Sequence, residues 1–329
     1  MKSDNPSCSI IIRCYNEEEH IGRLLSGIMH QTIKDFEIIL VDSGSTDATL
    51  SIASRYPVKI VYISPEEFSF GRALNKGCEA AEGEFLVFIS AHCWPVYEDW
   101  LETLTKPFQD SDVALVYGKQ RGNEITKFTE HQIFLSWFPE ISNLDQKTPF
   151  CNNANCAIRK KVWEKIPYNE ELTGLEDLDW AKRALEAGYN IAYSSEAEII
   201  HVHEETPRRI YNRYRREAIA LKKIYPNEHF TIIDFIRSYL TNISADCLKA
   251  AKEHVFMENI KGIIIFRLMQ FGGAYKGFRE RDHISKTLKR TFYYPKSLKK
   301  SLRPDPKQFR GGYIDYSHLE SVNNNEENH

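Results

Sequence analysis

Residues 85–95, FLVFISAHCWP, join a strongly apolar run to a polar end. The run from Phe85 to Ile89 is too short for a helix and rich in aromatic and branched side chains, so it predicts a strand that is buried on both faces. His92 stands just beyond the end of that strand. A polar imidazole directly after a buried strand suggests a functional role, and other polar residues of the sequence indicate what that role is.

The chain before this strand alternates between two kinds of apolar pattern. Runs that predict strands and amphipathic helices follow one another at residues 8–13, 21–28, 36–41, 49–56, 58–63 and 71–81. This alternation predicts right-handed crossovers between parallel strands, and so an α/β fold in which a doubly wound sheet carries helices on both faces. Ligands bind such sheets beyond the carboxyl ends of the strands. The polar loops 13–17, 42–47 and 90–93 are therefore expected to meet at one site.

Two aspartates in the second of these loops receive different interpretations. Asp42 comes directly after the strand 36–41, and we interpret it as a ligand-binding residue. Asp47 stands just before a predicted helix, where an aspartate most often caps the helix.

Composition restricts the class of protein. The chain has 329 residues, of which 42% are hydrophobic, so it can bury a sizeable core. Its net charge of −3 gives no global signature of nucleic-acid binding. No stretch approaches the roughly 18 uncharged apolar residues of a spanning helix, and the start has no sustained apolar run typical of an export signal. The seven cysteines are odd in number and form no Cys-x-x-Cys pair, which favours a reducing cytoplasm over a disulfide framework.

Three carboxylates, Glu176, Asp177 and Asp179, stand at the start of a predicted helix. Negative charge is favoured at helix N-termini, which accounts for such a cluster without any catalytic role. A carboxylate held there could instead act as general base toward a hydroxyl nucleophile, a role worth roughly 10²–10⁴ in rate. The residues alone leave both interpretations open.

Two histidines, His201 and His203, follow a predicted strand. Residues two apart in an extended chain point the same way, so both rings can face one site. The alternative is that one ring is structural and the other exposed. His92, at the end of another strand, favours a shared site, because imidazoles from separate segments suit a divalent transition metal.

Several motifs occur in the order of a known family. They are IIRCYNEEEHIGRLL, EIILVDSGSTDAT, FSFGRALNKGCEAAEGEFLVFISAHCWP, NNANCAIRK, LTGLEDLDWAKRALEAGYNIAY and HVH. In this order they resemble the family-2 glycosyltransferases of the GT-A fold, an α/β fold with a mixed sheet, and most of all the rhamnosyltransferase-like enzymes of bacterial surface polysaccharides. The resemblance covers residues 8–205. It implies an inverting transfer of a sugar from a nucleotide-diphosphate sugar to a hydroxyl of a glycan or lipid-linked acceptor.

The resemblance also assigns roles to individual residues. Asp177 matches the aspartate that deprotonates the acceptor hydroxyl, with Glu176 as its partner in an acidic pair. His203, with His201 as the alternative, matches the histidine that joins the metal or diphosphate site. The residues matched to the donor nucleotide are Arg13, Tyr15, Glu17, Asp42, Arg72, Asn75 and Ser90.

His92 departs from the family pattern, in which an aspartate usually holds a divalent metal against the diphosphate. Because neutral imidazole prefers softer ions to Mg²⁺, we expect a divalent metal at His92, His203 and His201, with Mn²⁺ favoured over Mg²⁺. Two alternatives stay open. A protonated His92 and Arg72 could neutralise the leaving diphosphate without a metal, or the chain could be a catalytically inactive member that binds nucleotide or glycan.

The C-terminal third changes in character. Between Arg208 and Lys223 seven basic residues stand against one acidic residue, and amphipathic helical patterns follow. We therefore divide the chain into a catalytic domain (1–205), a basic helical extension (206–295) and a tail (296–329) that is expected to be partly disordered. The extension resembles those of family members at the inner face of the cytoplasmic membrane, where basic helices attract anionic lipid. Packing on the catalytic domain or a homodimer contact is the alternative.

Overall fold

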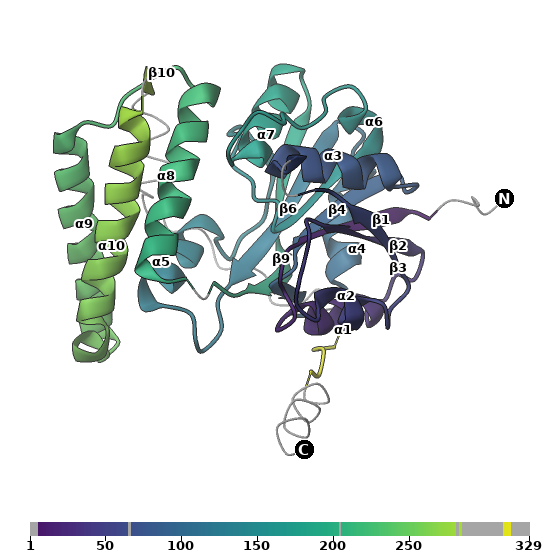
Figure 1. Ribbon diagram of the computed structural model, residues 1–329, viewed down its shortest axis with the longest axis horizontal. Helices are drawn as coiled ribbons and strands as arrows, with labels where there is room; N and C mark the ends of the chain where they lie inside the picture. Colours follow the sequence, from purple (N-terminus) through teal and green to yellow (C-terminus); the bar gives the residue numbers. More distant parts are fainter. Residues whose placement is uncertain (1–5, 65–66, 204, 281–282, 285–311, 317–329) are drawn as a thin grey trace.

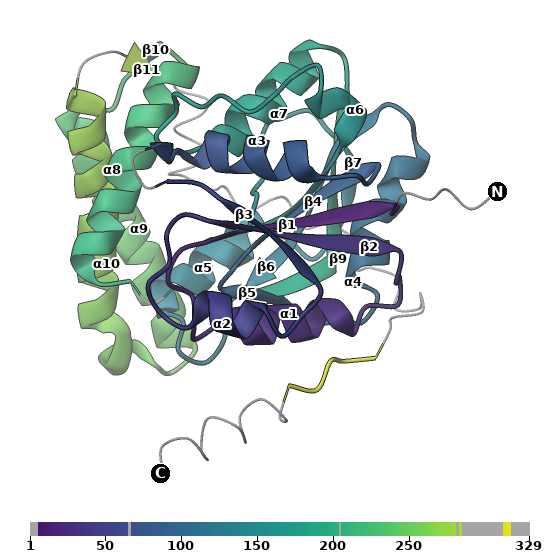
Figure 2. The ribbon, with the colours of Figure 1, turned by 45° about the vertical axis from the view of Figure 1, so that its right-hand side comes forward.

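The computed structural model describes residues 6–64, 67–203, 205–280, 283–284 and 312–316. These residues form a sheet with helices on both faces and a group of three long helices beside it (Figure 1). A view turned by 45° shows the same arrangement, with the long helices along one side of the sheet-bearing part (Figure 2).

Nine strands of the described chain form one sheet in the order β3-β2-β1-β4-β8-β6-β9-β5, with β7 paired to β9. Their bounds are β1 Cys8–Cys14, β2 Phe36–Asp42, β3 Val58–Tyr62, β4 Phe85–Ser90, β5 Cys93–Pro95, β6 Val113–Arg121, β7 Asn143–Gln146, β8 Asn155–Arg159 and β9 Asn190–His201. The first four strands are parallel neighbours, as the sequence predicts. β8 is antiparallel to both β4 and β6, so the sheet is mixed beyond β4.

Side-chain alternation explains why both faces of this sheet are buried. In β1, Ile10 and Ile12 belong to one apolar core and Ile11 belongs to the other. The first core is covered by α1 (Ile21–Met29), α2 (Thr49–Ala53) and α4 (Trp100–Thr105), and the second by α3 (Phe70–Ala80), α6 (Lys160–Trp163) and α7 (Glu176–Glu186). The predicted α/β architecture with two helical layers is confirmed. The sequence pattern left the region of α5 (Phe128–Trp137) unassigned.

The later part of the sheet differs from expectation. The sequence predicts two short strands at 191–193 and 199–200, whereas the structure has one long strand, β9, which pairs with β6, β5 and β7. Gly118 of β6 pairs with Ser194, but Gln120 pairs with Ile199, so β9 bulges in between. The intervening residues interrupt the apolar pattern, which is why the strand reads as two in the sequence.

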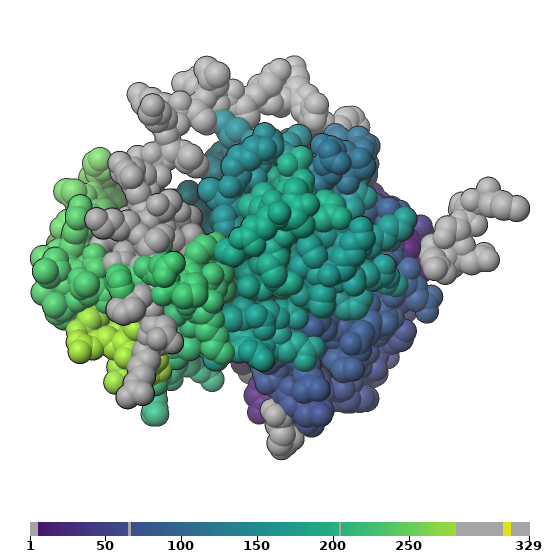
Figure 3. Space-filling view, turned by 90° about the horizontal axis from the view of Figure 1, so that it is seen from above, coloured from purple at the N-terminus to yellow at the C-terminus, as the bar shows by residue number. Residues whose placement is uncertain are grey.

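Three long helices make up the C-terminal extension. They are α8 (Pro207–Ile224), α9 (Ile232–Lys252) and α10 (Phe256–Arg279), with the short pair β10 (Asn227–Glu228) and β11 (His283–Ile284) beside them. Leu221 of α8 shares an apolar core with Leu178 of α7, so α8 packs on the catalytic part. Gly277 brings α10 close to α8, because a Cβ there would lie 2.4 Å from the carbonyl oxygen of Arg215. α10 lies between α8 and α9 (Figure 1), and from above the extension forms one flank of the molecule (Figure 3).

Residues 312–316 lie against the catalytic part. The backbone N–H of Ile314 donates to Val96 at 3.2 Å, and the Tyr316 hydroxyl donates to the carbonyl of Pro95 at 2.7 Å. This piece of the predicted tail therefore has a defined place beside β5, whereas the other tail residues lie outside the described ranges. None of the described helices combines the length and the apolar character needed to cross a bilayer.

Candidate active site and histidine cluster

Three polar loops meet at the carboxyl ends of the parallel strands, as predicted. The sheet register pairs Arg13 at the end of β1 with Ser90 at the end of β4, while Asp42 ends the neighbouring strand β2. His92 lies two residues beyond Ser90, and its carbonyl accepts a hydrogen bond from the backbone N–H of Val202 at 3.3 Å. Residues separated by more than 100 positions are thereby brought to one edge of the sheet.

Asp42 and Asp47 shape the loop after β2. The Asp42 carboxylate accepts hydrogen bonds from the backbone N–H groups of Gly44 at 3.0 Å and Ser45 at 3.1 Å, and the side chain is buried. Asp47 accepts from the backbone N–H of Thr49 at 3.0 Å and from its hydroxyl at 2.5 Å. The capping interpretation of Asp47 is confirmed. Asp42 holds the loop in shape, and its contact with a nucleotide stays a prediction.

Asn75 has a different role from the one expected. Its amide nitrogen donates to the carbonyl of Tyr168 at 3.0 Å and to Glu170 at 2.9 Å, while its oxygen accepts from the backbone N–H of Tyr168 and from the indole of Trp163, both at 3.0 Å. These four hydrogen bonds occupy every donor and acceptor position of the amide. Asn75 therefore fastens α3 to the loop before α7 and has no group left for the donor.

Two other side chains matched to the donor remain accessible. The ring of Tyr15, just beyond β1, is 56% exposed. The Arg72 guanidinium, near the start of α3, lies 3.7 Å from Glu170, and both side chains are open to solvent. Both can therefore contact a ligand without rearrangement of the core.

The acidic pair opens α7. Leu175, directly before it, has φ 56°, a left-handed conformation that is uncommon outside glycine, and it turns the chain into the helix. Glu176 accepts a hydrogen bond from Arg13 Nη1 at 3.0 Å, which joins the start of α7 to the end of β1. Asp179 is engaged elsewhere, in an ion pair of 2.8 Å with Arg183 one turn along the helix. Asp179 therefore fits the interpretation that an acidic residue merely complements the helix dipole, while Glu176 contacts Arg13 at the edge of the sheet where the polar loops meet.

Asp177 has the environment of a proton acceptor. Its carboxylate accepts hydrogen bonds from the backbone N–H groups of Asn153 at 3.0 Å and Leu178 at 2.8 Å. Burial and the adjacent charge of Glu176 raise the pKa of Asp177 to about 7, although the two N–H groups and the Arg13 guanidinium oppose the rise. A carboxyl group that titrates near neutral pH is suited to general base catalysis.

A pair of arginines borders the acidic pair. The guanidinium carbon of Arg13 lies 5.0 Å from the ring centroid of Phe70, and that of Arg216 lies 4.6 Å from it. Arg216 belongs to α8, and its carbonyl accepts a hydrogen bond from the Thr173 hydroxyl at 3.0 Å. The C-terminal extension thus brings a positive charge to the site, a contribution that no motif in the sequence indicated.

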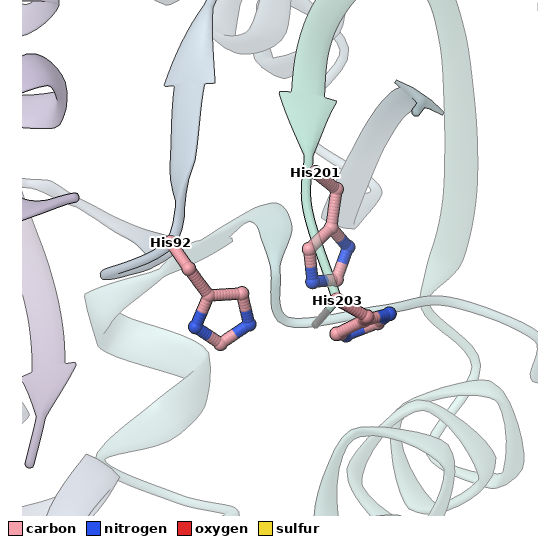
Figure 4. A group of neighbouring side chains, drawn as sticks. All are labelled: His92, His201 and His203. Carbon is pink, nitrogen blue, oxygen red and sulfur yellow. The ribbon is translucent and has the colours of Figure 1, made fainter. Parts of the chain in front are cut away.

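His92, His201 and His203 form a compact cluster (Figure 4). One ring nitrogen from each lies within 4.8 Å of the others. The ring centroids of His201 and His203 are 4.1 Å apart, and that of His92 lies 5.1 Å and 5.5 Å from them. The structure therefore brings together the three histidines that the sequence analysis grouped as ligands of one metal.

The hydrogen bonds of the cluster leave one nitrogen of each ring available. Nδ1 of His92 lies 3.0 Å from Glu17, Nδ1 of His201 lies 2.7 Å from Gln120, and Nδ1 of His203 lies 2.8 Å from Glu130. A carboxylate or amide oxygen can only accept, so these contacts favour the tautomer with the proton on Nδ1 and the lone pair on Nε2. At His203 the donor Arg213 Nη1 also lies 3.4 Å from Nδ1 and acts against this tautomer. The buried Nε2 of His201 has no hydrogen-bond partner. This arrangement fits a bound divalent metal.

Two rings of this cluster, His201 and His203, are held neutral. Burial lowers the pKa of His201 and of His203 well below the ordinary value, and the neighbouring rings and Arg213 lower it further. Neutral imidazoles are the form that binds metal. Imidazole ligands suit divalent transition ions better than they suit Mg²⁺, which prefers oxygen.

The residues that orient the cluster were not predictable from the sequence. Gln120 comes from β6 and Glu130 from α5, and Glu130 is itself held by Arg213 of α8 at 3.0 Å. Arg213 also pairs with Glu205 at 2.8 Å. These partners lie 8 to 83 positions apart in the chain without a recurring spacing, so only the fold reveals them.

Comparisons with known proteins agree with this geometry. A family model described as glycosyl transferase family 2 matches residues 9–166. The O-antigen chain rhamnosyltransferase WbaN of Salmonella anatum is 34% identical over 221 residues, which cover 64% of this chain and 70% of the relative. The O-antigen chain rhamnosyltransferase RfbN of Salmonella typhimurium is 29% identical over 219 residues, which cover 63% of this chain and 69% of the relative.

A solved structure shares the fold. The mannosyltransferase PcManGT from Pyrobaculum calidifontis, solved in complex with GDP-Man and Mn²⁺, superposes with a TM-score of 0.57 at 17% identity and covers 85% of this chain and 89% of its own. This likeness in fold agrees with the GT-A fold expected from the motifs. The sequence relative WbaN is 34% identical to this chain and is covered over 70% of its length, and the family model matches the N-terminal half. The chain therefore belongs to glycosyl transferase family 2.

Proposed function

We propose that this glycosyltransferase moves a sugar from a nucleotide-diphosphate sugar to a hydroxyl of a glycan or lipid-linked acceptor, with inversion at the anomeric carbon, during assembly of a bacterial surface polysaccharide. The names of the relatives, O-antigen chain rhamnosyltransferases, support this class of acceptor and a deoxyhexose donor. The observation that carries the proposal is the position of Asp177, a carboxyl group with a pKa of about 7 at the same sheet edge as the histidine cluster.

Asp177 acts as the general base in this proposal. It takes the proton of the acceptor hydroxyl while that oxygen forms a bond to the anomeric carbon and the bond to the nucleotide diphosphate breaks. Attack from the face opposite the leaving group inverts the configuration. Glu176 keeps the pKa of Asp177 high, and the ion pair between Glu176 and Arg13 fixes the pair at the end of β1.

The donor lies across the ends of β1 and β4 in this proposal. The exposed ring of Tyr15 faces the nucleoside, Arg13, Glu17 and Ser90 line the edge of the sheet, and Arg72 offers a charge to the diphosphate. Asp42 supports the loop beneath the nucleoside. Asn75 is left out, because its amide is fully engaged within the protein.

The three Nε2 atoms of His92, His201 and His203 would hold the divalent metal. Such an ion supplies positive charge that stabilises the leaving diphosphate. Glu17, Gln120 and Glu130 orient the rings and keep the proton on Nδ1. We propose Mn²⁺ as a better ion than Mg²⁺ here, because three imidazoles and no carboxylate make up the ligand set.

A thermal-unfolding panel tests the donor and the metal together. The purified chain is heated with UDP, dTDP, GDP or CMP, each in EDTA, Mg²⁺ or Mn²⁺. A nucleotide at 100 times its dissociation constant adds about 2.7 kcal/mol, which raises the midpoint by several degrees. Stabilisation by one nucleotide in Mn²⁺ alone supports the metal site, whereas equal stabilisation in EDTA means that His92 and Arg72 neutralise the diphosphate without a metal. Stabilisation by none of the four contradicts the proposed donor class.

A further inference from the structure

The helix pair α9–α10 has an unusual distribution of apolar side chains. On α9 the inward positions include Ser238, Asn242 and Asp246, of which Ser238 and Asp246 are buried. The outward positions carry large apolar side chains instead, among them Ile233 and Leu240. A surface helix normally places its apolar stripe inward. Phe235 and Tyr239 of α9 do pack inward against the core of the extension, but a second set of large apolar side chains on α9 faces outward.

A buried ion pair explains the polar inner face. Arg267 of α10 donates to Asp246 of α9 through two nitrogens, at 2.8 Å and 3.0 Å, and through a third to Gln270 at 2.7 Å. Such a paired and hydrogen-bonded network specifies how two helices align, without supplying much of the apolar burial that holds them together. Asp246 is thus engaged inside the helix pair, and Ser238 and Asn242 donate to backbone carbonyls of their own helix, whereas the outward apolar residues of α9 are left exposed within the described chain.

The outward residues form a single surface, which we call the outer apolar face. It consists of Ile233, Ile236, Leu240 and Leu248 on α9 and Met257, Ile264 and Leu268 on α10, all more than one-third exposed. The contacts Asp246–Arg267 and Phe235–Tyr275 show that the two helices run antiparallel. A helix turns by about 100° per residue, so the exposed apolar residues of α9 and those of α10 fall on the same side of the line along which the two helices contact each other. α8 lies against α10 on the side of the sheet, whereas α9 and α10 stand at the end of the molecule away from the sheet (Figure 1).

Positive charge predominates among the exposed charged residues of α9 and α10. The exposed charged residues of α9 and α10 are Arg237, Lys249, Lys252, Lys261, Lys276 and Arg279 against Glu258. The three helices of the extension together carry 14 Lys and Arg against 4 Asp and Glu. Two copies that joined through this face would bring like charges together, which is unfavourable. An anionic lipid surface is instead complementary in both respects, because it accepts apolar side chains and attracts cations.

We propose that the outer apolar face of α9 and α10 docks on the surface of an anionic lipid bilayer, with the helices lying in the plane of the interface. The apolar side chains enter the boundary between headgroups and acyl chains, and the flanking Lys and Arg contact the lipid phosphates. α8 then connects this membrane face to the active site through Arg213 and Arg216. The inference does not depend on which sugar or nucleotide the site binds.

Vesicle sedimentation of the full chain tests the proposal. Vesicles of phosphatidylcholine alone are compared with vesicles that also contain phosphatidylglycerol, at low and high salt. We expect binding only with phosphatidylglycerol, and weaker binding at high salt because salt screens the cations. Leu240→Asp and Leu268→Asp should each lower the vesicle affinity about tenfold or more, since each removes an apolar side chain that docking would bury in the bilayer and adds a charge that an anionic bilayer repels.

Leu144→Asp is the matched control. Leu144 lies on β7 of the catalytic part and is 58% exposed, while Leu240 is 57% exposed, so the two substitutions change equally accessible leucines. The control should bind vesicles as the native chain does, and all variants should unfold at the native temperature. Equal affinity of Leu240→Asp and the native chain, or absence of binding to phosphatidylglycerol vesicles, overturns the proposal. A native dimer in light scattering that Leu240→Asp dissociates would assign the face to a second copy instead and would equally overturn it.

Discussion

The pH dependence of the transfer step gives a direct test of the proposed base. Asp177 must be ionised to accept a proton, and its pKa of about 7 means that about half of the molecules are competent at pH 7. Because the ionised fraction of such a group falls about tenfold for each pH unit below its pKa, kcat/KM should fall about tenfold from pH 6 to pH 5 and level off above neutral pH. An unperturbed aspartate, with a pKa near 3.8, would give no such fall in this range.

The cause of the raised pKa can be removed selectively. After burial, the negative charge of Glu176 is the next largest cause, while the Arg13 guanidinium acts in the opposite direction. Glu176→Gln removes the repulsion and leaves Arg13 in place, so the acidic limb of the profile should move to lower pH. Asp179→Asn is the matched control, because Asp179 lies at the start of the same helix but pairs with Arg183. The acidic limb of its kcat/KM profile should stay at the native pH.

The assay is transfer from the donor identified by the thermal panel, measured as release of nucleoside diphosphate between pH 5 and pH 9. Asp177→Asn should lose about 10²–10⁴ in kcat, the range that general base catalysis supplies, and should still be stabilised by the nucleotide. An unmoved limb in Glu176→Gln would show that another group titrates. An Asp177→Asn variant within a few-fold of native kcat would remove Asp177 from the role of base.

Three further variants test the surroundings of the site. Glu130→Gln should weaken binding of Mn²⁺ about tenfold in isothermal titration, because loss of the charged partner makes the imidazole of His203 a poorer ligand. The control Glu124→Gln, in the exposed neighbouring loop, should leave the Mn²⁺ affinity unchanged. His92→Asp should raise the affinity for Mg²⁺ relative to Zn²⁺, since a carboxylate prefers the harder ion, and an unchanged order of metals would place the ion elsewhere. Asn75→Ala should lower the free energy of unfolding by roughly 2–4 kcal/mol in chemical denaturation, because buried donors lose their acceptor. Its nucleotide affinity should stay native, and a large loss of nucleotide affinity at native stability would return Asn75 to the donor site.

Local patterns were sufficient for the N-terminal half of the fold. Continuous apolar runs such as Ile10–Ile12 predict strands buried on both faces, and their alternation with amphipathic helices leaves few topologies for a parallel sheet. The carboxyl ends of parallel strands meet at one edge whatever their details, so the meeting of Arg13, Asp42 and Ser90 followed from strand order alone. The cap at Asp47 was equally local, because it involves residues within one turn.

Patterns failed where long-range partners decide the structure. β9 reads as two strands because the polar residues of its bulge are accommodated by neighbours that the sequence does not place beside it. Asn75 looked available for a ligand, and only the packing of α3 against the segment around Tyr168 shows its amide to be occupied. Propensity and periodicity are properties of short windows, whereas these outcomes depend on contacts across more than 70 residues.

The sequence by itself determined the chemistry available to this protein: three histidines and an acidic pair placed at the ends of predicted strands and at a helix start, in the order of one enzyme family. Only the tertiary structure decided how that chemistry is tuned. Gln120 and Glu130 set the proton on the histidines, Arg13 and Glu176 set the charge beside Asp177, and α8 reaches the site from the extension. The reason is physical, because hydrogen bonds and charges act over a few ångströms in space and depend on folding to bring distant residues together.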